Sequence, residues 1–254
     1  MSRFLIQEEG QAVKITIESE EEGKYNLVDV KFMHQFIDTL RALEREKRIR
    51  FVIIRGKGNF GAGADIRELK KASEDIEYAT NFFHTMYEMF RVLFNFPKLI
   101  IANVEGIAYG ASLELLLGFD FVIASENAKF AAPGGRIGVF PPVLVTIGKE
   151  ILGWKAVREM AFLGKELTAK EAKEIGLVYE VADSFDDANY KLLQQLKQMA
   201  PTSLIQMRSL IYRKYDEELK YAFERLIEQV QTEDARNGIY AFLTRTKPNW
   251  AITP

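Results

Sequence analysis

Cysteine is absent from this chain of 254 residues, and histidine occurs only twice. Without cysteine there is no disulfide framework, no thiolate nucleophile and no cysteine-ligated metal site. The two histidines, His34 and His84, lie far apart in the sequence, which disfavours a histidine metal cluster. The composition therefore predicts a protein that binds no metal.

An excess of charge of either sign is also absent. The 34 lysine and arginine residues and the 36 acids leave a formal net charge of −2, which argues against nucleic acid or an anionic membrane as a partner. No apolar run reaches the ~18 residues of a membrane-spanning helix. The N-terminal stretch carries acids and lacks the apolar segment of a signal peptide. We expect a soluble protein of the cytoplasm.

What the sequence does contain is an alternation of strand-like and helix-like segments through its first two thirds. Hydrophobic residues make up 48% of the chain, enough for one large domain with a substantial core. Such an alternation is typical of an α/β architecture with a parallel sheet. The predicted strands are 12–17, 50–56, 98–106, 120–125 and 128–133, and the predicted helices are 30–48, with Asp29 as N-cap, 73–95 and 110–118.

The last third of the sequence is mainly helical in pattern. Apolar residues at helical spacing predict helices at 143–163, 168–175, 185–200, 201–215 and 216–244, with one short strand at 178–181. We therefore divide the chain into an α/β core, residues 1–165, and a C-terminal helical region, residues 166–254.

Two small-residue loops, GAGAD at 61–65 and YGAS at 109–112, each follow a predicted strand and lead into a helix. Each exposes backbone N–H groups at a helix start, where the helix dipole favours negative charge. If the two loops face each other, they form an oxyanion hole. GAGAD alone is weak evidence, because it lacks both the Lys-Ser/Thr pair of a phosphate-binding Walker loop and the third glycine of a dinucleotide fingerprint.

Glu114 interrupts an otherwise apolar helix, with Leu113 before it and three leucines after it. A carboxyl group removed from water has a raised pKa, and a raised pKa suits proton transfer near neutral pH. This pattern indicates a catalytic acid or base. The alternative is a partly exposed glutamate that pairs with a nearby lysine or arginine.

The order of five segments gives the sequence a specific resemblance. The segments are RFVIIRG with GAGADIREL, FPKLIIANVEG, YGASLE, AKFAAPGGRIGVFPP, and FLGKELTAKEAKEIGLVYEV. Together they resemble the crotonase (enoyl-CoA hydratase/isomerase) family over nearly the whole chain. The resemblance implies a crotonase-like (ββα) spiral core with a C-terminal helical oligomerisation region, and an assembly of three or six copies.

The resemblance also implies a catalytic site for an acyl-coenzyme A thioester. The backbone N–H groups of Ala64 and Ala111 would hold the thioester carbonyl, and Glu114 would be the acid/base. The family usually has glycine where Ala111 and Ser112 stand. The second glutamate of the two-acid hydratases is replaced here by Gly134, which leaves one acid for the chemistry.

Several reactions are compatible with this resemblance. The leading interpretation is a lyase or isomerase of the enoyl-CoA hydratase/isomerase type, acting in fatty acid metabolism through a thioester enolate. The alternatives are a decarboxylase of a malonyl-type thioester, a hydratase of cyclic dienoyl-CoA, which the stretch GVFPP resembles, and a non-catalytic CoA-binding or assembly subunit.

The resemblance further assigns residues to coenzyme A and to the acyl pocket. It implies no tightly bound or redox cofactor, since coenzyme A arrives as part of the substrate. Arg136 could bind a substrate carboxylate or form a surface ion pair, and His84 could serve the pocket or the core. The coenzyme positions are Ala62, Asp65, Ile66, Lys57, Arg67 and Lys247, and the pocket positions are His84, Tyr87, Gly110, Gly134, Arg136 and Phe140.

Overall fold

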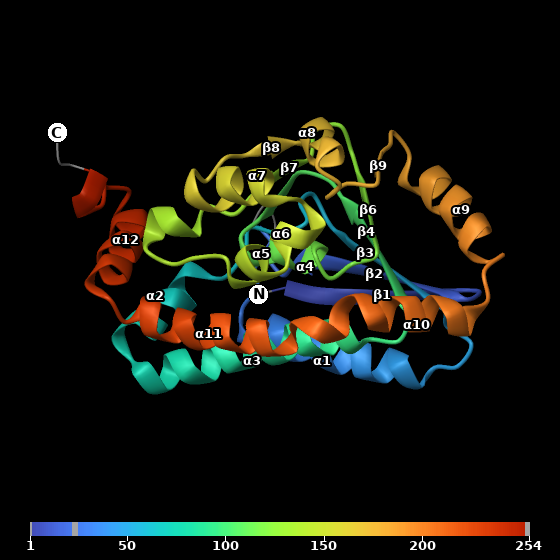
Figure 1. The fold of residues 1–254 in the computed structure, drawn as a ribbon, viewed down its shortest axis with the longest axis horizontal. Coiled ribbons are helices and arrows are strands. Elements are labelled where there is room, and N and C mark those ends of the chain that lie inside the picture. The colour runs from blue at the N-terminus through green and yellow to red at the C-terminus, as the bar shows by residue number, and fades with distance from the viewer. Residues whose placement is uncertain (1, 22–24, 252–254) are drawn as a thin grey trace.

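A six-stranded sheet forms the centre of the computed structural model, which describes residues 2–21 and 25–251 (Figure 1). The first two strands are antiparallel, and every later pair of neighbours is parallel. The predicted α/β architecture with a parallel sheet is therefore confirmed. In spatial order the strands are β1 (Ser2–Glu9), β2 (Ala12–Ser19), β3 (Phe51–Gly56), β4 (Leu99–Val104), β6 (Phe121–Ala124) and β9 (Glu180–Val181).

Strand β1 was not predicted from the sequence. It lies at the edge of the sheet, where most of its side chains, including Leu5 and Ile6, are exposed. It therefore lacks the alternation of buried and exposed positions on which a strand prediction relies. The central strand β4, in contrast, is buried at all six positions, as expected for a parallel strand covered on both faces.

A second, three-stranded sheet joins β5 (Ile107–Tyr109), β7 (Lys129–Ala131) and β8 (Leu167–Thr168). The predicted strand 98–106 ends early because Gly106, at a φ of 63°, turns the chain from β4 into β5. A Cβ atom at this position would lie 2.6 Å from the Gly58 carbonyl oxygen. This tight turn brings β5 beside the loop that follows β3.

Three long helices, α1, α3 and α11, run side by side along one side of the molecule (Figure 1). The predicted N-cap of α1 is confirmed, because the Asp29 carboxylate accepts a hydrogen bond from Phe32 N–H at 2.8 Å. The longer helices are α1 (Val30–Arg45), α2 (Ile66–Glu74), α3 (Ile76–Asn95), α9 (Phe185–Leu196), α10 (Pro201–Tyr212), α11 (Asp216–Val230) and α12 (Glu233–Thr244). The shorter ones are α4 (Ala111–Leu116), α5 (Pro142–Thr146), α6 (Gly148–Ile151), α7 (Trp154–Val157) and α8 (Ala169–Glu174).

Three predicted helices are interrupted in the structure. The predicted helix 143–163 is wrong as one element, since it comprises α5, α6, α7 and a π-helical turn, Arg158–Phe162, with Gly153 at a φ of 83° between α6 and α7. The predicted helix 216–244 divides where the Thr232 side chain caps α12. The predicted helix 73–95 begins only at Ile76, because Asp75 ends α2 and caps α3.

One hydrophobic core spans both predicted regions of the chain. Phe36 of α1, Phe90 of α3 and Phe223 of α11 all belong to it, and the Phe90 and Phe223 rings lie 6.0 Å apart. The division at residue 165 stays a prediction. In residues 2–21 and 25–251, no helix combines the length and the hydrophobicity that a membrane crossing requires.

Candidate active site

The two small-residue loops meet in the folded chain. Gly61 N–H donates to the Ile107 carbonyl at 3.0 Å, and Tyr109 N–H donates to the Gly61 carbonyl at 2.9 Å. The contact continues at the next turn, where a Cβ atom on Gly63 would lie 3.4 Å from Ala111 N. The loop after β3 and the loop before α4 therefore touch backbone to backbone.

The backbone N–H groups of the first loop have acceptors at every position from 61 to 65 except one. Ala62 donates to the Asn26 carbonyl at 2.9 Å, and Asp65 donates to the Val28 carbonyl at 3.3 Å. Gly63 donates to the Ser112 hydroxyl at 3.1 Å. Ala64 N–H has no acceptor among residues 2–21 and 25–251, although backbone donors in folded proteins are normally paired.

The second loop leaves a donor next to the first. Gly110, at a φ of 50°, directs the chain from β5 into α4, and its N–H donates to the Ala131 carbonyl at 2.8 Å. Ala111 follows as the first residue of α4, and its N–H has no acceptor within the described residues. The first loop therefore keeps one unpaired N–H group, that of Ala64, and the adjoining start of α4 keeps unpaired N–H groups that include Ala111, so both loops offer backbone donors.

Gly63 offers a direct test of this backbone contact. Its φ of 93° disfavours any side chain, and a Cβ atom would lie 2.9 Å from the Tyr109 carbonyl oxygen. Gly58 is a matched control, because its φ is 74° but a Cβ atom there would have no neighbour within 4 Å. We expect Gly63→Ala to lower the free energy of unfolding by about 1–3 kcal/mol more than Gly58→Ala, measured by urea denaturation. Equal losses would contradict the close approach.

Glu114 lies on α4, one helical turn after Ala111, and is 3% exposed. Its Oε1 atom accepts hydrogen bonds from Val143 N–H at 2.6 Å and Leu144 N–H at 2.9 Å. These donors belong to the first turn of α5, where Pro142 occupies the first position and has no N–H of its own. The sequence signal for this contact is the proline pair 141–142, which was considered only as part of the stretch GVFPP.

The Glu114 carboxyl group has no ion-pair partner among the described residues. Burial raises its pKa to about 8, while the hydrogen bonds from Leu144 and Val143 act in the opposite direction. The interpretation as an exposed, cation-paired glutamate therefore does not apply. Oε2 accepts no hydrogen bond from the described residues. It does not belong to the fully buried side-chain atoms that lack a partner, so it is not completely enclosed. One oxygen is thus fixed and the other is available for a proton.

Gly134, which stands where the resemblance places the second glutamate of the two-acid hydratases, begins the 3₁₀-helix η1 (Gly134–Ile137). A Cβ atom there would lie 3.1 Å from the Val139 carbonyl oxygen and 3.4 Å from the Phe140 Cα atom. The loop that contains Phe140 therefore packs directly against this position. Phe140 itself is half-buried against the main core.

Of the pocket candidates, His84 is exposed, and Tyr87 and Arg136 each form a hydrogen bond to another part of the chain. His84 is exposed on α3, whereas its neighbours Phe82 and Phe83 are buried. Tyr87 donates its hydroxyl to the Asp216 carboxylate at 2.8 Å, and burial together with this bond raises the pKa of Tyr87 to about 12. Arg136 is exposed and donates to the Gly164 carbonyl at 3.1 Å.

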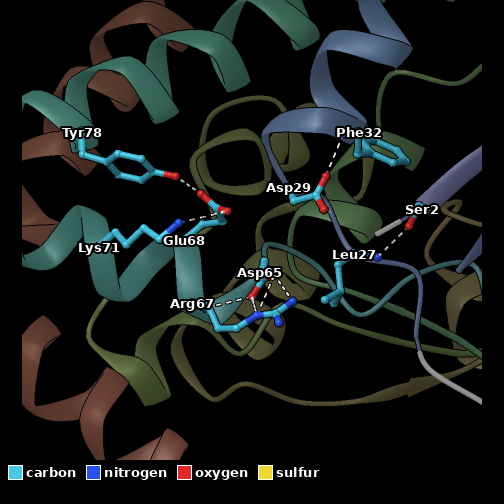
Figure 2. Close-up of polar contacts among 9 residues, drawn as sticks. All are labelled: Ser2, Leu27, Asp29, Phe32, Asp65, Arg67, Glu68, Lys71 and Tyr78. Atoms are coloured by element: carbon cyan, nitrogen blue, oxygen red, sulfur yellow. Dashed lines mark hydrogen bonds and ion pairs between the residues drawn. The ribbon is translucent and has the colours of Figure 1, made fainter. Parts of the chain in front are cut away.

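Two of the candidate coenzyme positions, Asp65 and Arg67, lie at the start of α2 (Figure 2). Asp65 caps α2 and forms an ion pair with Arg67, with 2.7 Å between Oδ2 and Nη2. Burial alone would raise the pKa of Asp65, but the hydrogen bonds and charge of Arg67 lower it overall. Lys57 lies 3.1 Å from the Glu18 carboxylate, and Lys247 is exposed. Ala62 and Ile66, which lie on either side of Asp65 in the sequence, are half-buried.

Two further contacts near the loops were missed from the sequence. The Ser112 hydroxyl is one, because this serine was considered only as a replacement for a family glycine and not as a hydrogen-bond acceptor. The other is the Tyr109 hydroxyl, which donates to Glu166, whose other oxygen lies 3.5 Å from Lys129. Burial and this bond raise the pKa of Tyr109 to about 12. No sequence spacing links residues 109 and 166, so no local pattern could have indicated the pair.

Comparison with known proteins places this geometry in a family. The profile of the family described as enoyl-CoA hydratase/isomerase matches residues 8–252, so the chain belongs to the enoyl-CoA hydratase/isomerase (crotonase) family. A probable enoyl-CoA hydratase of Bacillus subtilis is 30% identical over 237 residues, which cover 89% of this chain and 90% of the relative. Carnitinyl-CoA dehydratase of Escherichia coli O157:H7 is 30% identical over 258 residues, 95% of each chain.

The solved structures agree on the fold. An enoyl-CoA hydratase from Bacillus halodurans superposes with a TM-score of 0.83 at 22% identity, covering 94% of this chain and 99% of that one. The predicted crotonase-like fold is therefore confirmed. In the described ranges, no group of three histidine or acidic side chains could hold a metal ion. That no metal is bound stays a prediction.

Proposed function

We propose that this protein is an acyl-CoA enzyme of the hydratase/isomerase type that works through a thioester enolate. The backbone N–H groups of Ala64 and Ala111 would bind the thioester oxygen, and Glu114 would carry the proton. The observation that supports this best is the contact between two loops that carry the unpaired N–H groups of Ala64 and Ala111, with Ala111 one helical turn from a buried carboxyl group that has a free oxygen. The kinship with hydratases and a dehydratase of CoA thioesters supports the same class.

The proposed step moves one proton. Glu114 takes a proton from the α-carbon, the C–H electrons become the enolate, and the thioester oxygen gains negative charge between the two N–H groups. The enolate then takes the proton back at the α- or the γ-carbon. Each N–H donor of an oxyanion hole typically contributes ~10²–10³ in rate. A positioned acid/base contributes ~10²–10⁴.

The pKa of Glu114 fits this task. At a pKa of about 8, roughly one tenth of the carboxyl groups are ionised at pH 7, and each ionised group is a stronger base than an ordinary carboxylate. The proton that it takes is therefore held firmly enough to be returned to carbon. The fixed Oε1 and the available Oε2 divide positioning from proton transfer between the two oxygens.

The glycine at 134 favours double-bond migration over hydration. Migration needs one group that removes and returns a proton, whereas hydration must also activate water. Gly134 supplies no second acid, and the nearby Arg136 is directed to the Gly164 carbonyl. The contact with Gly164 also occupies one nitrogen of Arg136, the residue considered as a ligand for a substrate carboxylate, so decarboxylation is the less favoured alternative.

For coenzyme A, we propose that the adenine lies against Ala62, Asp65 and Ile66, with Lys57, Arg67 and Lys247 near the phosphates. For assembly, we propose a homotrimer or a pair of trimers. Large apolar side chains, including Trp154, Phe162 and Phe242, are exposed in the single chain, and a subunit interface would cover them. Light scattering should then give three or six times the 29.1 kDa of one chain.

The test of the proposed function is α-deuterium incorporation in D₂O. Saturated, 2-enoyl, 3-enoyl, cyclic dienoyl and methylmalonyl thioesters of CoA are incubated with the protein, and mass and product are followed. We expect exchange, with turnover of the 3-enoyl thioester, and a ~10²–10⁴-fold loss in Glu114→Gln. Binding without exchange for every thioester would refute the enzyme and favour a non-catalytic CoA-binding subunit.

A further inference from the structure

Ser112 occupies the space between the two loops. It is 3% exposed, and its hydroxyl accepts the Gly63 N–H at 3.1 Å. The nearest atom to a Cβ placed on Gly61 would be this same hydroxyl oxygen. The side chain therefore does not extend into an open pocket, and it fills a gap that two glycines of the first loop leave.

The hydrogen bond joins the immediate neighbours of the proposed donors Ala64 and Ala111. Gly63 precedes Ala64, and Ser112 follows Ala111. The Gly63 carbonyl is also fixed, because it accepts from Val28 N–H at 2.9 Å. Since the N–H and C=O of a trans peptide point in opposite directions, this bond directs the Ala64 N–H away from Val28.

Without the hydroxyl, Gly63 would be held at its carbonyl side only. Glycine has the widest range of backbone conformations, and a residue at a φ of 93° depends on its surroundings to stay there. A rotation at Gly63 would turn the Ala64 N–H relative to the Ala111 N–H. The distance between the donors and the oxygen that they bind would then change, and an oxyanion hole is sensitive to that distance.

We propose that Ser112 is a positioning residue, which holds the two N–H donors in register for the charged form of the substrate. This inference rests on the proposed function and deepens it. The relevant ligand is a thioester of coenzyme A in its enolate form. Ser112 itself would touch neither the substrate nor the proton that moves.

The test compares an enolate with an uncharged thioester. Acetoacetyl-CoA forms an enolate that absorbs in the near ultraviolet, whereas butyryl-CoA binds as a neutral thioester. We expect Ser112→Ala to lower the affinity for the acetoacetyl-CoA enolate, and kcat for α-exchange, by about 10- to 100-fold. The affinity of this variant for butyryl-CoA and its KM should stay within about threefold, whereas a merely structural loss would weaken the binding of both thioesters to a similar extent.

The control variant is Ser73→Ala, which removes another buried serine hydroxyl, one that donates to the Lys70 carbonyl at 2.7 Å. It should leave the ratio of the two affinities unchanged. Ser112→Thr keeps the hydroxyl and should restore most of the enolate signal. If the unaltered protein gives an enolate signal and Ser112→Ala leaves the ratio of the two affinities unchanged, the role of Ser112 is overturned and the proposed function is not. No enolate signal in the unaltered protein would overturn the proposed function as well.

Discussion

Replacement of Glu114 by glutamine is expected to stabilise the folded protein relative to the unaltered one. The difference in the free energy of unfolding should grow by about 4 kcal/mol from pH 5 to pH 9. The folded state raises the pKa of this acid from its ordinary 4.5 to about 8, so the folded protein holds the proton more tightly than the unfolded chain does. The resulting stability is fully present below about pH 4.5 and is lost as the pH rises through about 8. Glutamine cannot ionise, so the variant escapes this loss.

Urea denaturation of both proteins at pH 5, 7 and 9 measures the effect. The amide oxygen of glutamine can still accept the two N–H groups of α5, so the contact should survive. Glu126→Gln is the surface control, because the hydrogen bond and charge of Lys170 lower the pKa of that exposed carboxyl and no gain with pH is expected. Parallel stability curves for Glu114→Gln and the unaltered protein would mean that Glu114 ionises normally and is a poor candidate for the acid/base.

The second large effect is expected at Arg208. This side chain is 2% exposed and lies 3.0 Å from the Asp120 carboxylate. Its remaining donors meet four backbone carbonyls, those of Leu93, Phe94, Phe96 and Gly118. We expect Arg208→Met to lower the free energy of unfolding by about 3–5 kcal/mol, because it leaves a buried acid and four carbonyl groups without their partner. Urea denaturation at pH 7 measures the loss.

Two further variants separate the parts of this network. Arg208→Lys keeps the charge but not the planar set of donors, so its loss should be smaller than that of Arg208→Met. Of the three variants, Asp120→Asn should lower the free energy of unfolding least. Burial already opposes the charge on Asp120 by raising its pKa, and the amide oxygen of asparagine can still accept from Ile100 N–H. A loss below about 1 kcal/mol in Arg208→Met would show that water replaces the arginine at little cost.

Much of the fold could be predicted because its signals are local. The β-branched run at 52–54 and the buried run at 99–104 define the central strands, and Asp29 defines the start of α1. The breaks in the predicted helix 143–163 were missed, because the apolar pattern continues across Gly148 and Gly153. Here the glycine conformation overrides the hydrophobic periodicity.

The site was predictable only as a set of segments. GAGAD, YGAS and Glu114 could be selected because glycine loops and a lone acid among leucines are visible in the sequence. Their mutual contacts could not be, since the Gly63–Ser112 bond joins residues 49 positions apart and the Glu114–Val143 bond joins residues 29 apart. Exposure was equally hidden, which is why His84 was considered for the pocket although it faces solvent on α3.

The position of Arg208 late in the chain also has a consequence for biosynthesis. Its four carbonyl partners and Asp120 are all made by residue 120, and the arginine that satisfies them is added 88 residues later. A nascent chain that has already formed α3 and α4 must therefore leave these carbonyl groups to water until α10 has left the ribosome. Synthesis proceeds at roughly 5–20 residues per second, so this interval lasts several seconds, and chaperones would have access to the incomplete core throughout it.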